Sequence, residues 1–191
     1  MIPTFRYRRL LDAAAAQVGL PDWIYRGELH LGGEWLEGLV LGESNGNPAA
    51  FRYEAHQDRA RRVDVAQDPD TAGHDDGLLE DDASYGLMQV MGYNARRLAG
   101  VPEGTPMNFG WLFLPIINIA LGLRILTAEL RQVAREIGDG KAPAHQHVER
   151  ALARYNGGPT GDDTVNGDIR LRKYVERVVD HSRRVKLARG R

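Results

Sequence analysis

The feature that most constrains the fold is a helical periodicity that recurs along almost the whole chain. In residues 116–137, apolar side chains return every three or four positions and so share one face of a helix. The residues on this face are Asn118, Leu121, Gly122, Ile125, Leu126, Leu130, Val133 and Ile137. Strand signals are weak, and only Val63–Val65 suggests a short hairpin. The sequence therefore predicts a mainly α fold.

Further helices are predicted where the same pattern is bounded by start and stop signals. They cover residues 6–18, 33–43, 84–89, 93–99, 145–155 and a final stretch that begins near Asp168. The aligned residues of the last two are Val148, Ala151, Leu152 and Tyr155, and then Leu171, Tyr174, Val175, Val178, Ser182 and Val185. Gly19–Leu20–Pro21 ends the first helix, and Asn156–Gly157–Gly158–Pro159 ends the fifth.

Composition excludes several classes of function. The chain has 191 residues, which is enough for one domain with a core, and a formal net charge of -1. The absence of cysteine excludes disulfides, thiolate metal sites and a cysteine nucleophile. The stretch from Arg170 to Arg191 is basic but lacks interleaved aromatic residues beyond Tyr174, so no nucleic-acid partner is predicted.

Residues 54–82 interrupt the helical pattern. They contain ten acidic residues and three arginines, and they show no periodicity, which predicts a long irregular acidic insertion. The aspartates of this segment, and the pair His145 and His147, lack the spacing of known ion sites, so no metal or cofactor is predicted. Around this insertion we predict a single domain at residues 31–191, preceded by a helical extension at residues 1–30.

No apolar run in the sequence is long enough for a signal sequence or a membrane span. We therefore expect a protein that is made without a signal peptide and that does not insert into a membrane.

The candidate catalytic residue is Glu43, at the end of the helix predicted for residues 33–43. Leu36, Leu39 and Val40 lie seven, four and three positions before Glu43, so all four side chains share one face. A carboxylic acid in apolar surroundings loses the hydration of its charged form and keeps its proton to higher pH. A protonated acid is what general acid catalysis requires. The alternative reading is a glutamate at a helix end that turns outward into water.

Other polar side chains lie where burial is expected. Asn118 and Tyr155 fall on apolar helix faces, which suggests that several helix ends meet at a polar cleft, although each alone is more often a satisfied core residue. Gly86 allows close backbone approach, and Gln89 offers a donor and an acceptor suited to a sugar amide or hydroxyl. Ser84 is equally suited to capping a helix.

Four short segments, in this order, resemble the motifs of the soluble lytic transglycosylase family of the lysozyme superfamily. They are Glu43–Ser44 with Asn47–Pro48–Ala49; Gly86–Leu87–Met88–Gln89; Asn118–Ile119 with Gly122 and Leu126; and Ala153–Arg154–Tyr155–Asn156–Gly157–Gly158. Tyr174–Val175 resembles a further terminal element, so the resemblance spans roughly residues 33–180. Three departures are the early Pro48, Ile125 in place of an aromatic residue, and the insertion between Glu43 and Gly86.

The resemblance implies a lysozyme-like fold and cleavage of peptidoglycan at the β-1,4 bond from N-acetylmuramic acid to N-acetylglucosamine. One carboxylic acid of such enzymes protonates the leaving oxygen and then deprotonates the muramyl 6-hydroxyl, which gives a 1,6-anhydro end. Glu43 holds that position here. The implied substrate-binding residues are Ser84, Met88, Gln89, Tyr155, Asn156 and Tyr174, and the implied structural residues are Ser44, Gly86 and Asn118.

Two alternatives stay open. A second carboxylate from residues 75–82 would hold a water and make the enzyme a hydrolytic muramidase, as in the related goose-type lysozymes. Alternatively, the chain is a structural phage tail or baseplate subunit that keeps the fold.

The setting is also suggested by resemblance. Phe51–Arg52–Tyr53–Glu54 and Ser84–Tyr85 resemble a branch that is frequent in bacteriophage and prophage proteins. The resemblance therefore implies a phage-encoded enzyme that is made in the bacterial cytoplasm, acts at the cell wall, and serves wall penetration or lysis. Its expected partners are peptidoglycan glycan strands and other phage tail or baseplate proteins, and it would act as a free enzyme or as a virion component.

Overall fold

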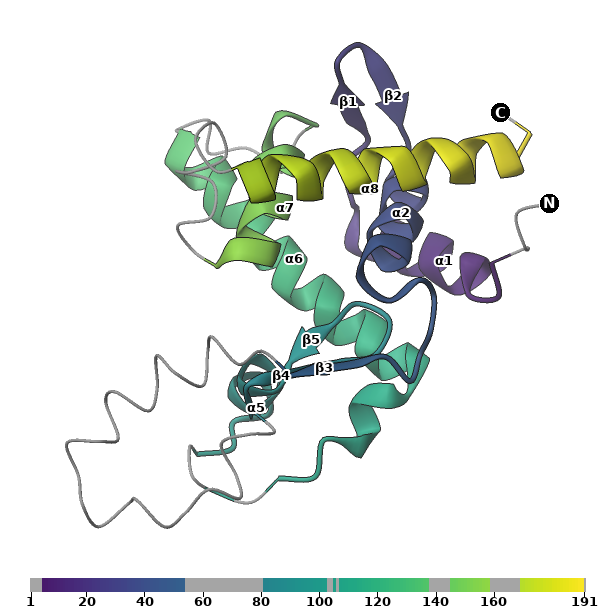
Figure 1. The fold of residues 1–191 in the computed structure, drawn as a ribbon. Coiled ribbons are helices and arrows are strands. Elements are labelled where there is room, and N and C mark those ends of the chain that lie inside the picture. The colour runs from purple at the N-terminus through teal and green to yellow at the C-terminus, as the bar shows by residue number, and fades with distance from the viewer. Residues whose placement is uncertain are drawn as a thin grey trace. The chain divides into compact units, whose positions relative to one another are not determined.

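The computed structural model describes residues 5–53, 81–102, 105, 107–137, 145–158 and 169–190. The chain divides into two compact units (Figure 1). The first unit comprises Met1–Gly46 and Gly122–Arg191, and the second comprises Asn47–Leu121. Among the described residues are six α-helices and only short strands, so the predicted mainly α fold is confirmed.

The helices lie close to their predicted positions. Their bounds are α1 Arg8–Val18, α2 Gly32–Ser44, α5 Gly92–Ala99, α6 Pro115–Ile137, α7 His145–Gly157 and α8 Ile169–Ala188, with a short 3-10 helix, η1, at Gly110–Phe113. The first five of these α-helices match their predictions to within two residues at either end, and α8 begins one residue after the predicted start near Asp168. None of the helices in these described ranges has a stretch long and apolar enough to cross a membrane.

The helix predicted for residues 84–89 is wrong. Strand β4, Ala83–Tyr85, pairs antiparallel with β5, Val90–Met91, and on its other side with β3, Phe51–Tyr53. Between β4 and β5, Gly86 has φ +72° and Gln89 has φ +48°. Such left-handed backbone angles are incompatible with a right-handed helix, and they turn the chain into a hairpin instead.

The predicted helical extension at residues 1–30 is helical only in α1. Strands β1, Trp23–Tyr25, and β2, Glu28–His30, form an antiparallel hairpin. Its turn residues Arg26 and Gly27 both have positive φ, as a tight two-residue hairpin requires. Strands this short show too little alternation to be read from sequence. The hairpin suggested at Val63–Val65 and the insertion up to residue 80 lie outside the described residues.

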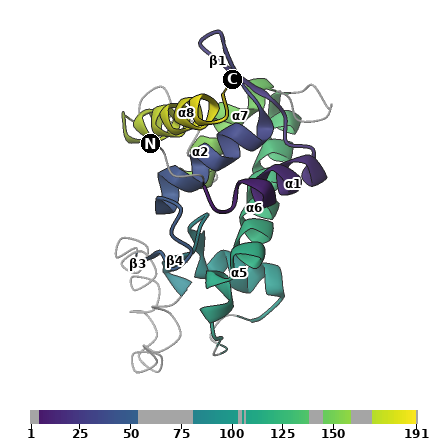
Figure 2. The same cartoon turned by 90° about the vertical axis from the view of Figure 1, so that its right-hand side faces the viewer.

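In the first unit, α1 packs antiparallel along α2 (Figure 2). The direction of α1 relative to α2 follows from the neighbours of two glycines, Gly33 at the start of α2 and Gly46 just after its end. A Cβ atom added at Gly33 would lie 2.3 Å from Asp12 Oδ1, and one at Gly46 would lie 2.4 Å from Phe5. The start of α1 therefore lies beside the end of α2, where Glu43 is.

Helix α8 packs against α2 from another side and crosses it at a steep angle (Figure 1). At Gly38 the two backbones nearly touch, because an added Cβ would lie 2.7 Å from Val178 O and 2.8 Å from Ser182 N. The predicted apolar face of α8, from Leu171 to Val185, is buried as expected. The close approach at Gly38 fixes where α8 lies along α2.

An ion-pair network around a buried carboxylate joins α1, α2 and Arg189, the residue that follows α8. Glu37, on α2, is 1% exposed. Its carboxylate accepts hydrogen bonds from Arg8 Nη2 at 2.9 Å and from Arg189 Nη2 at 2.8 Å. Arg189 also donates to Asp12. Leaving a buried carboxylate without partners is costly. Arg8 and Arg189, near the two ends of the described chain, supply the partners of Glu37, so both ends are held against α2.

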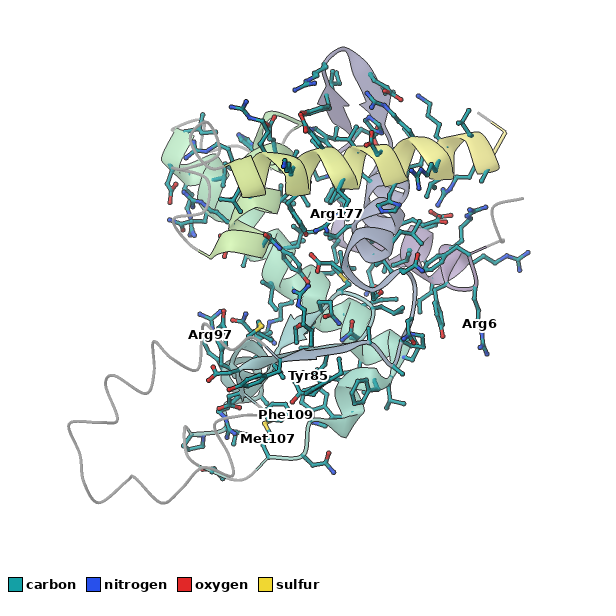
Figure 3. All side chains as sticks on the ribbon, viewed as in Figure 1. Arg6, Tyr85, Arg97, Met107, Phe109 and Arg177 are labelled. Atoms are coloured by element: carbon teal, nitrogen blue, oxygen red, sulfur yellow. The ribbon has the colours of Figure 1, made fainter. Side chains whose placement is uncertain are left out.

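The second unit has an aromatic core around Tyr85. Its ring centroid lies 5.3 Å from that of Phe51, 5.5 Å from Phe109 and 5.6 Å from Phe113 (Figure 3). Next to this cluster, Arg96 of α5 lies over the ring of Phe109 and pairs with the buried Asp81. These contacts hold α5 and η1 to the three-stranded sheet.

Helix α6 begins in the second unit and continues in the first. Asn118, Gly122, Leu126, Leu130 and Val133 of its predicted face are buried, and Leu121 and Ile125 are half-buried. Ile137, at the end of the same face, is 42% exposed. Ile137 is the last residue of α6, so no following turn of the helix helps to cover it.

Candidate active site

Glu43 lies at the C-terminal end of α2, where a fully buried apolar stripe reaches the surface. Leu36, Leu39 and Val40 are buried as predicted, whereas the Glu43 side chain is half-buried. The helix ends one residue later at Ser44, and Asn45 caps it in the left-handed conformation with φ 53°. The carboxylate therefore combines an apolar background with access from outside.

The Tyr174 hydroxyl donates a hydrogen bond of 2.5 Å to Glu43 Oε1. Tyr174 belongs to the buried face of α8 and is 3% exposed. The sequence placed Tyr174 among the substrate-binding candidates but gave no signal for this contact, because the two residues are 131 positions apart. Only the packing of α8 on α2 brings them together.

Tyr155, at the end of α7, also lies within electrostatic reach of Glu43. Burial, followed by the charge of Glu43, raises the pKa of Tyr155 well above its usual value. The same two causes, and the hydrogen bond to Glu43, raise the pKa of Tyr174. Both phenols therefore stay protonated near neutral pH, so Tyr174 remains a hydrogen-bond donor to the carboxylate.

Further side chains of the first unit frame this group. Arg177 lies over the ring of Tyr174, with its guanidinium carbon 5.3 Å from the centroid (Figure 3). The Ser44 hydroxyl is buried and donates to Val40 O at 3.0 Å, which fits its predicted structural role. Asn156 follows Tyr155 at the exposed end of α7.

Asn118 connects three segments of the second unit. Its Nδ2 donates to Tyr85 O at 2.7 Å and to Leu112 O at 2.9 Å, and its Oδ1 accepts from the Met88 amide at 2.7 Å. A Cβ atom at Gly86 would lie 2.4 Å from Asn118 Nδ2. Gly86 and Asn118 therefore form one structural unit, in which the glycine makes room for the amide.

Ser84 and Gln89 bond to each other within the same hairpin. The Ser84 hydroxyl is 1% exposed and donates to Gln89 Oε1 at 2.9 Å. Gln89 Nε2 donates to Gly86 O at 2.9 Å and to Ala50 O at 3.3 Å. Met88 is fully buried. These contacts favour a role in shaping the hairpin over direct sugar binding for Ser84 and Met88.

The candidate second carboxylates are only partly within the described residues. Asp75, Asp76 and Glu80 lie outside them. Asp81 is buried, and both of its oxygens accept from Arg96 Nε, at 3.0 and 2.7 Å. Asp82 is also buried. Across the described part of the chain, no three metal-ligating side chains come together.

The predicted site residues thus form two groups. Glu43, Tyr155 and Tyr174 meet in the first unit, and Ser84, Gly86, Met88, Gln89 and Asn118 meet in the second. A buried aromatic donor on a carboxylate at a helix end is an arrangement suited to proton transfer.

Comparison with known families agrees with this arrangement. Residues 33–173 match the transglycosylase SLT domain, so the chain belongs to the SLT transglycosylase family. It is a lytic transglycosylase, an enzyme that acts on peptidoglycan. Neither a curated protein nor a solved structure matches the chain. The family match begins at the second residue of α2 and ends directly before Tyr174.

Proposed function

We propose that the protein cleaves the β-1,4 bond between N-acetylmuramic acid and N-acetylglucosamine, with Glu43 as the single general acid and base. The observation that carries this proposal is the hydrogen bond from the buried Tyr174 hydroxyl to Glu43 Oε1. A carboxyl group that must give and then accept one proton needs a fixed orientation, and a buried phenol supplies it.

The first half of the proposed reaction is proton donation. Because Oε1 accepts the Tyr174 hydrogen bond, the proton of the neutral acid would be carried by Oε2. Oε2 would protonate the glycosidic oxygen as its bond to the muramyl C1 breaks. Glu43 is then a carboxylate, and the Tyr174 hydrogen bond stabilises its charge.

The second half returns the proton. Positive charge on the muramyl ring is quenched when the ring's own 6-hydroxyl oxygen bonds to C1, and Glu43 Oε2 takes the proton of that hydroxyl. The products are a 1,6-anhydro-muramyl end and a free N-acetylglucosaminyl end, and no water is consumed. Tyr155 and Asn156, at the end of α7, would contact the sugar beside Glu43.

The hairpin of the second unit would contribute mainly by its shape. We propose that Gln89 Oε1, which accepts one hydrogen bond from Ser84, offers its second acceptor site to a sugar substituent. Met88 and Gly86 would support that turn through Asn118.

We propose transglycosylation over hydrolysis. A hydrolase needs a second carboxylate to hold the attacking water. Among the candidates in residues 75–82, Asp81 is occupied by Arg96 and Asp82 is buried, which makes both poor water-holding bases.

We further propose a domain organisation and a setting. Residues 31–191 would be the catalytic domain, and residues 1–30 an extension that stabilises α2 through α1 and Arg8. A bacteriophage or prophage setting, with action at the cell wall during penetration or lysis, is supported by the resemblance of Phe51–Arg52–Tyr53–Glu54 and Ser84–Tyr85 to that branch. Immunoblotting of purified phage particles would separate a virion component from a free enzyme.

The catalytic proposal is tested with Glu43→Gln. We expect purified peptidoglycan to be solubilised by the unchanged protein and not by Glu43→Gln, while the two proteins have the same melting temperature. Glu37→Gln is not a suitable control, because Glu37 belongs to the buried ion-pair network. Glu129→Gln, a change on α6 within the first unit, is the matched control and should leave activity intact. Full activity in Glu43→Gln would refute the assignment.

A further inference from the structure

Arg177 is an exposed arginine of α8 that lies next to the Glu43 group (Figure 3). Its guanidinium carbon is 5.3 Å from the centroid of the Tyr174 ring, and the hydroxyl of that ring donates to Glu43 Oε1. A Cβ atom added at Gly42, the residue before Glu43, would lie 3.8 Å from Arg177 Nε. A positive charge therefore lies one aromatic ring away from the proposed catalytic acid.

The hydrogen-bond donors of Arg177 are available to a ligand. None of the residues that the structure describes accepts a hydrogen bond from its guanidinium group. The two acidic residues next to it on α8 pair with other arginines, since Glu176 accepts from Arg26 at 3.1 Å and Asp180 accepts from Arg183 at 3.1 Å. The contact with the phenol ring requires no acceptor and leaves the N–H groups unused.

The electrostatic surroundings of Arg177 are positive. Burial lowers the pKa of His181, which is one turn further along α8, and the charges of Arg184 and Arg177 lower it more than Asp180 raises it. His181 therefore stays neutral at neutral pH, and the two arginines outweigh the carboxylate at this part of the helix. Such surroundings attract an anion.

The proposed substrate carries an anion at a matching place. Its muramyl residue has a lactyl ether at C3, two bonds away from the C1 atom at which Glu43 would act. The carboxyl group of the lactyl ether is either a free carboxylate or the attachment point of a peptide with carboxylates of its own. N-acetylglucosamine has no such group, so only the muramyl residue would bring a negative charge close to Glu43.

We infer that Arg177 binds a carboxylate that the lactyl group of this muramyl residue carries, an inference that rests on the proposed function. A guanidinium group can donate two parallel hydrogen bonds to one carboxylate, which adds specificity to the attraction of opposite charges. Arg177 would then select the muramyl residue, and not N-acetylglucosamine, as the sugar whose C1 faces Glu43.

The carboxylate has two sources. In a glycan strand without peptides it is the lactyl carboxylate itself, and in a strand with peptides it belongs to the peptide stem. The charge and the hydrogen-bond geometry are the same in both cases, so the two sources are distinguished by the choice of substrate.

Binding is tested by calorimetry in the Glu43→Gln protein, so that no strand is cleaved. The probes are tetrasaccharides of alternating N-acetylglucosamine and N-acetylmuramic acid, with free lactyl carboxylates, with peptide stems, or with uncharged lactyl N-methylamides. The test variant adds Arg177→Gln. The matched control adds Arg184→Gln, which removes another exposed arginine of α8, about two turns beyond Arg177.

We expect Arg177→Gln to weaken the binding of a charged strand about tenfold, which is typical for one hydrogen-bonded charge pair, and to leave the binding of the N-methylamide strand unchanged. Arg184→Gln should not affect any of the three strands. A loss only with the free-carboxylate strand assigns the lactyl carboxylate, and a loss only with the peptide-bearing strand assigns the peptide. A loss with both shows that either carboxylate can bind.

Three results would overturn the inference. An equal loss with the N-methylamide strand would show that Arg177 only supports the structure of the site. An equal loss in Arg184→Gln would show that binding follows the net charge of α8. Unchanged binding of both charged strands would exclude a carboxylate site at Arg177. Failure of every strand to bind would refute the proposed function as well, whereas binding that ignores Arg177 refutes this inference alone.

Discussion

At the scale of single residues, the account depends on how Glu43 is held. The carboxyl group sits at the end of a helix whose inner face is fully buried, and one of its oxygens accepts a short hydrogen bond from Tyr174. Burial and the charge of Glu43 raise the pKa of Tyr174, so the phenol donates throughout the neutral range. One oxygen of Glu43, Oε1, is thus held in place by Tyr174, and the other, Oε2, is the one proposed to give and accept the proton.

Removing this hydrogen bond should slow the reaction more than it weakens binding. For Tyr174→Phe we expect kcat to fall about ten- to hundredfold, which is the loss expected from one hydrogen bond to a charged group. KM for a defined glycan strand should hardly change, because Tyr174 contacts the acid. Tyr7→Phe removes a hydroxyl elsewhere in the first unit and is the control. A large rise in KM with unchanged kcat would show instead that Tyr174 binds the sugar.

Gly86 is required for two separable reasons, positive φ and close contact. An added Cβ would lie 2.4 Å from Asn118 Nδ2 and 2.6 Å from Leu112 O, at φ +72°. Gly100 has nearly the same angle, φ +69°, with nothing within 4 Å of its added Cβ. We expect Gly86→Ala to lower the free energy of unfolding by about 1–3 kcal/mol more than Gly100→Ala does. Equal losses in urea titrations would mean that backbone angle alone matters.

The Glu43 contact also shows what single-residue reasoning can reach. The spacing of Leu36, Leu39 and Val40 correctly predicts the buried stripe that leads to Glu43. It contains nothing about Tyr174, whose partner lies on another helix far along the chain. Ser84 and Gln89 show the same limit, because their mutual hydrogen bond depends on a hairpin that was not predicted.

At the scale of secondary-structure elements, α2 is the element on which the first unit is built. Helices α1 and α8 both pack on it, and Glu37 bonds to Arg8 of α1 and to Arg189, the residue that follows α8. The position of α8 along α2 determines whether Tyr174 reaches Glu43. The glycine at position 38 is what allows the two helices to approach closely enough.

Gly38→Ala should therefore destabilise the protein although alanine favours helices. Its Cβ would meet backbone atoms of α8 at 2.7 and 2.8 Å, which cannot move like a flexible side chain. We expect a loss of about 1–3 kcal/mol, or roughly 2–4 °C in melting temperature per kcal/mol. Gly42→Ala is the matched control on the same helix, where the nearest atoms are side chains at 3.8 Å. A melting temperature unchanged by Gly38→Ala would contradict this packing.

Helices were predictable from sequence, and the short strands were not. A helix such as α6 repeats its apolar pattern over several turns, so its bounds follow from local spacing. The hairpins at residues 23–30 and 83–91 have strands of two or three residues, too short for alternation to appear. Gln89 also adopts a positive φ, which non-glycine residues rarely do and which no local pattern indicates.

At the scale of the whole molecule, stability should depend on pH through His30. His30, at the end of β2, is fully buried, and its Nδ1 lies 2.9 Å from Ser182 Oγ on α8. Burial lowers the pKa of His30; Lys186 and Arg183 lower it further, and Glu28 and Glu34 oppose them. At a pH below about 6.5 the unfolded chain therefore binds a proton at His30 that the folded protein does not bind. The free energy of unfolding falls as the pH is lowered through this range.

The same argument predicts a difference between variants. We expect the melting temperature of the unchanged protein to fall between pH 7.5 and pH 5, and to fall less steeply in His30→Gln, which cannot titrate. The pKa of His181 is lowered in the same direction by its burial, but this contribution is present in both proteins. An identical pH dependence in the two proteins would exclude His30 as a source.

The central claim is that Glu43 acts alone and that no water enters the product. Digesting peptidoglycan with the unchanged protein in ¹⁸O-labelled water tests this most directly, because mass spectrometry of the muropeptides shows the origin of the oxygen at C1. The account predicts 1,6-anhydro-muramyl ends without ¹⁸O, which disappear with Glu43→Gln. Reducing muramyl ends that carry ¹⁸O would contradict it and would show that a second carboxylate activates water.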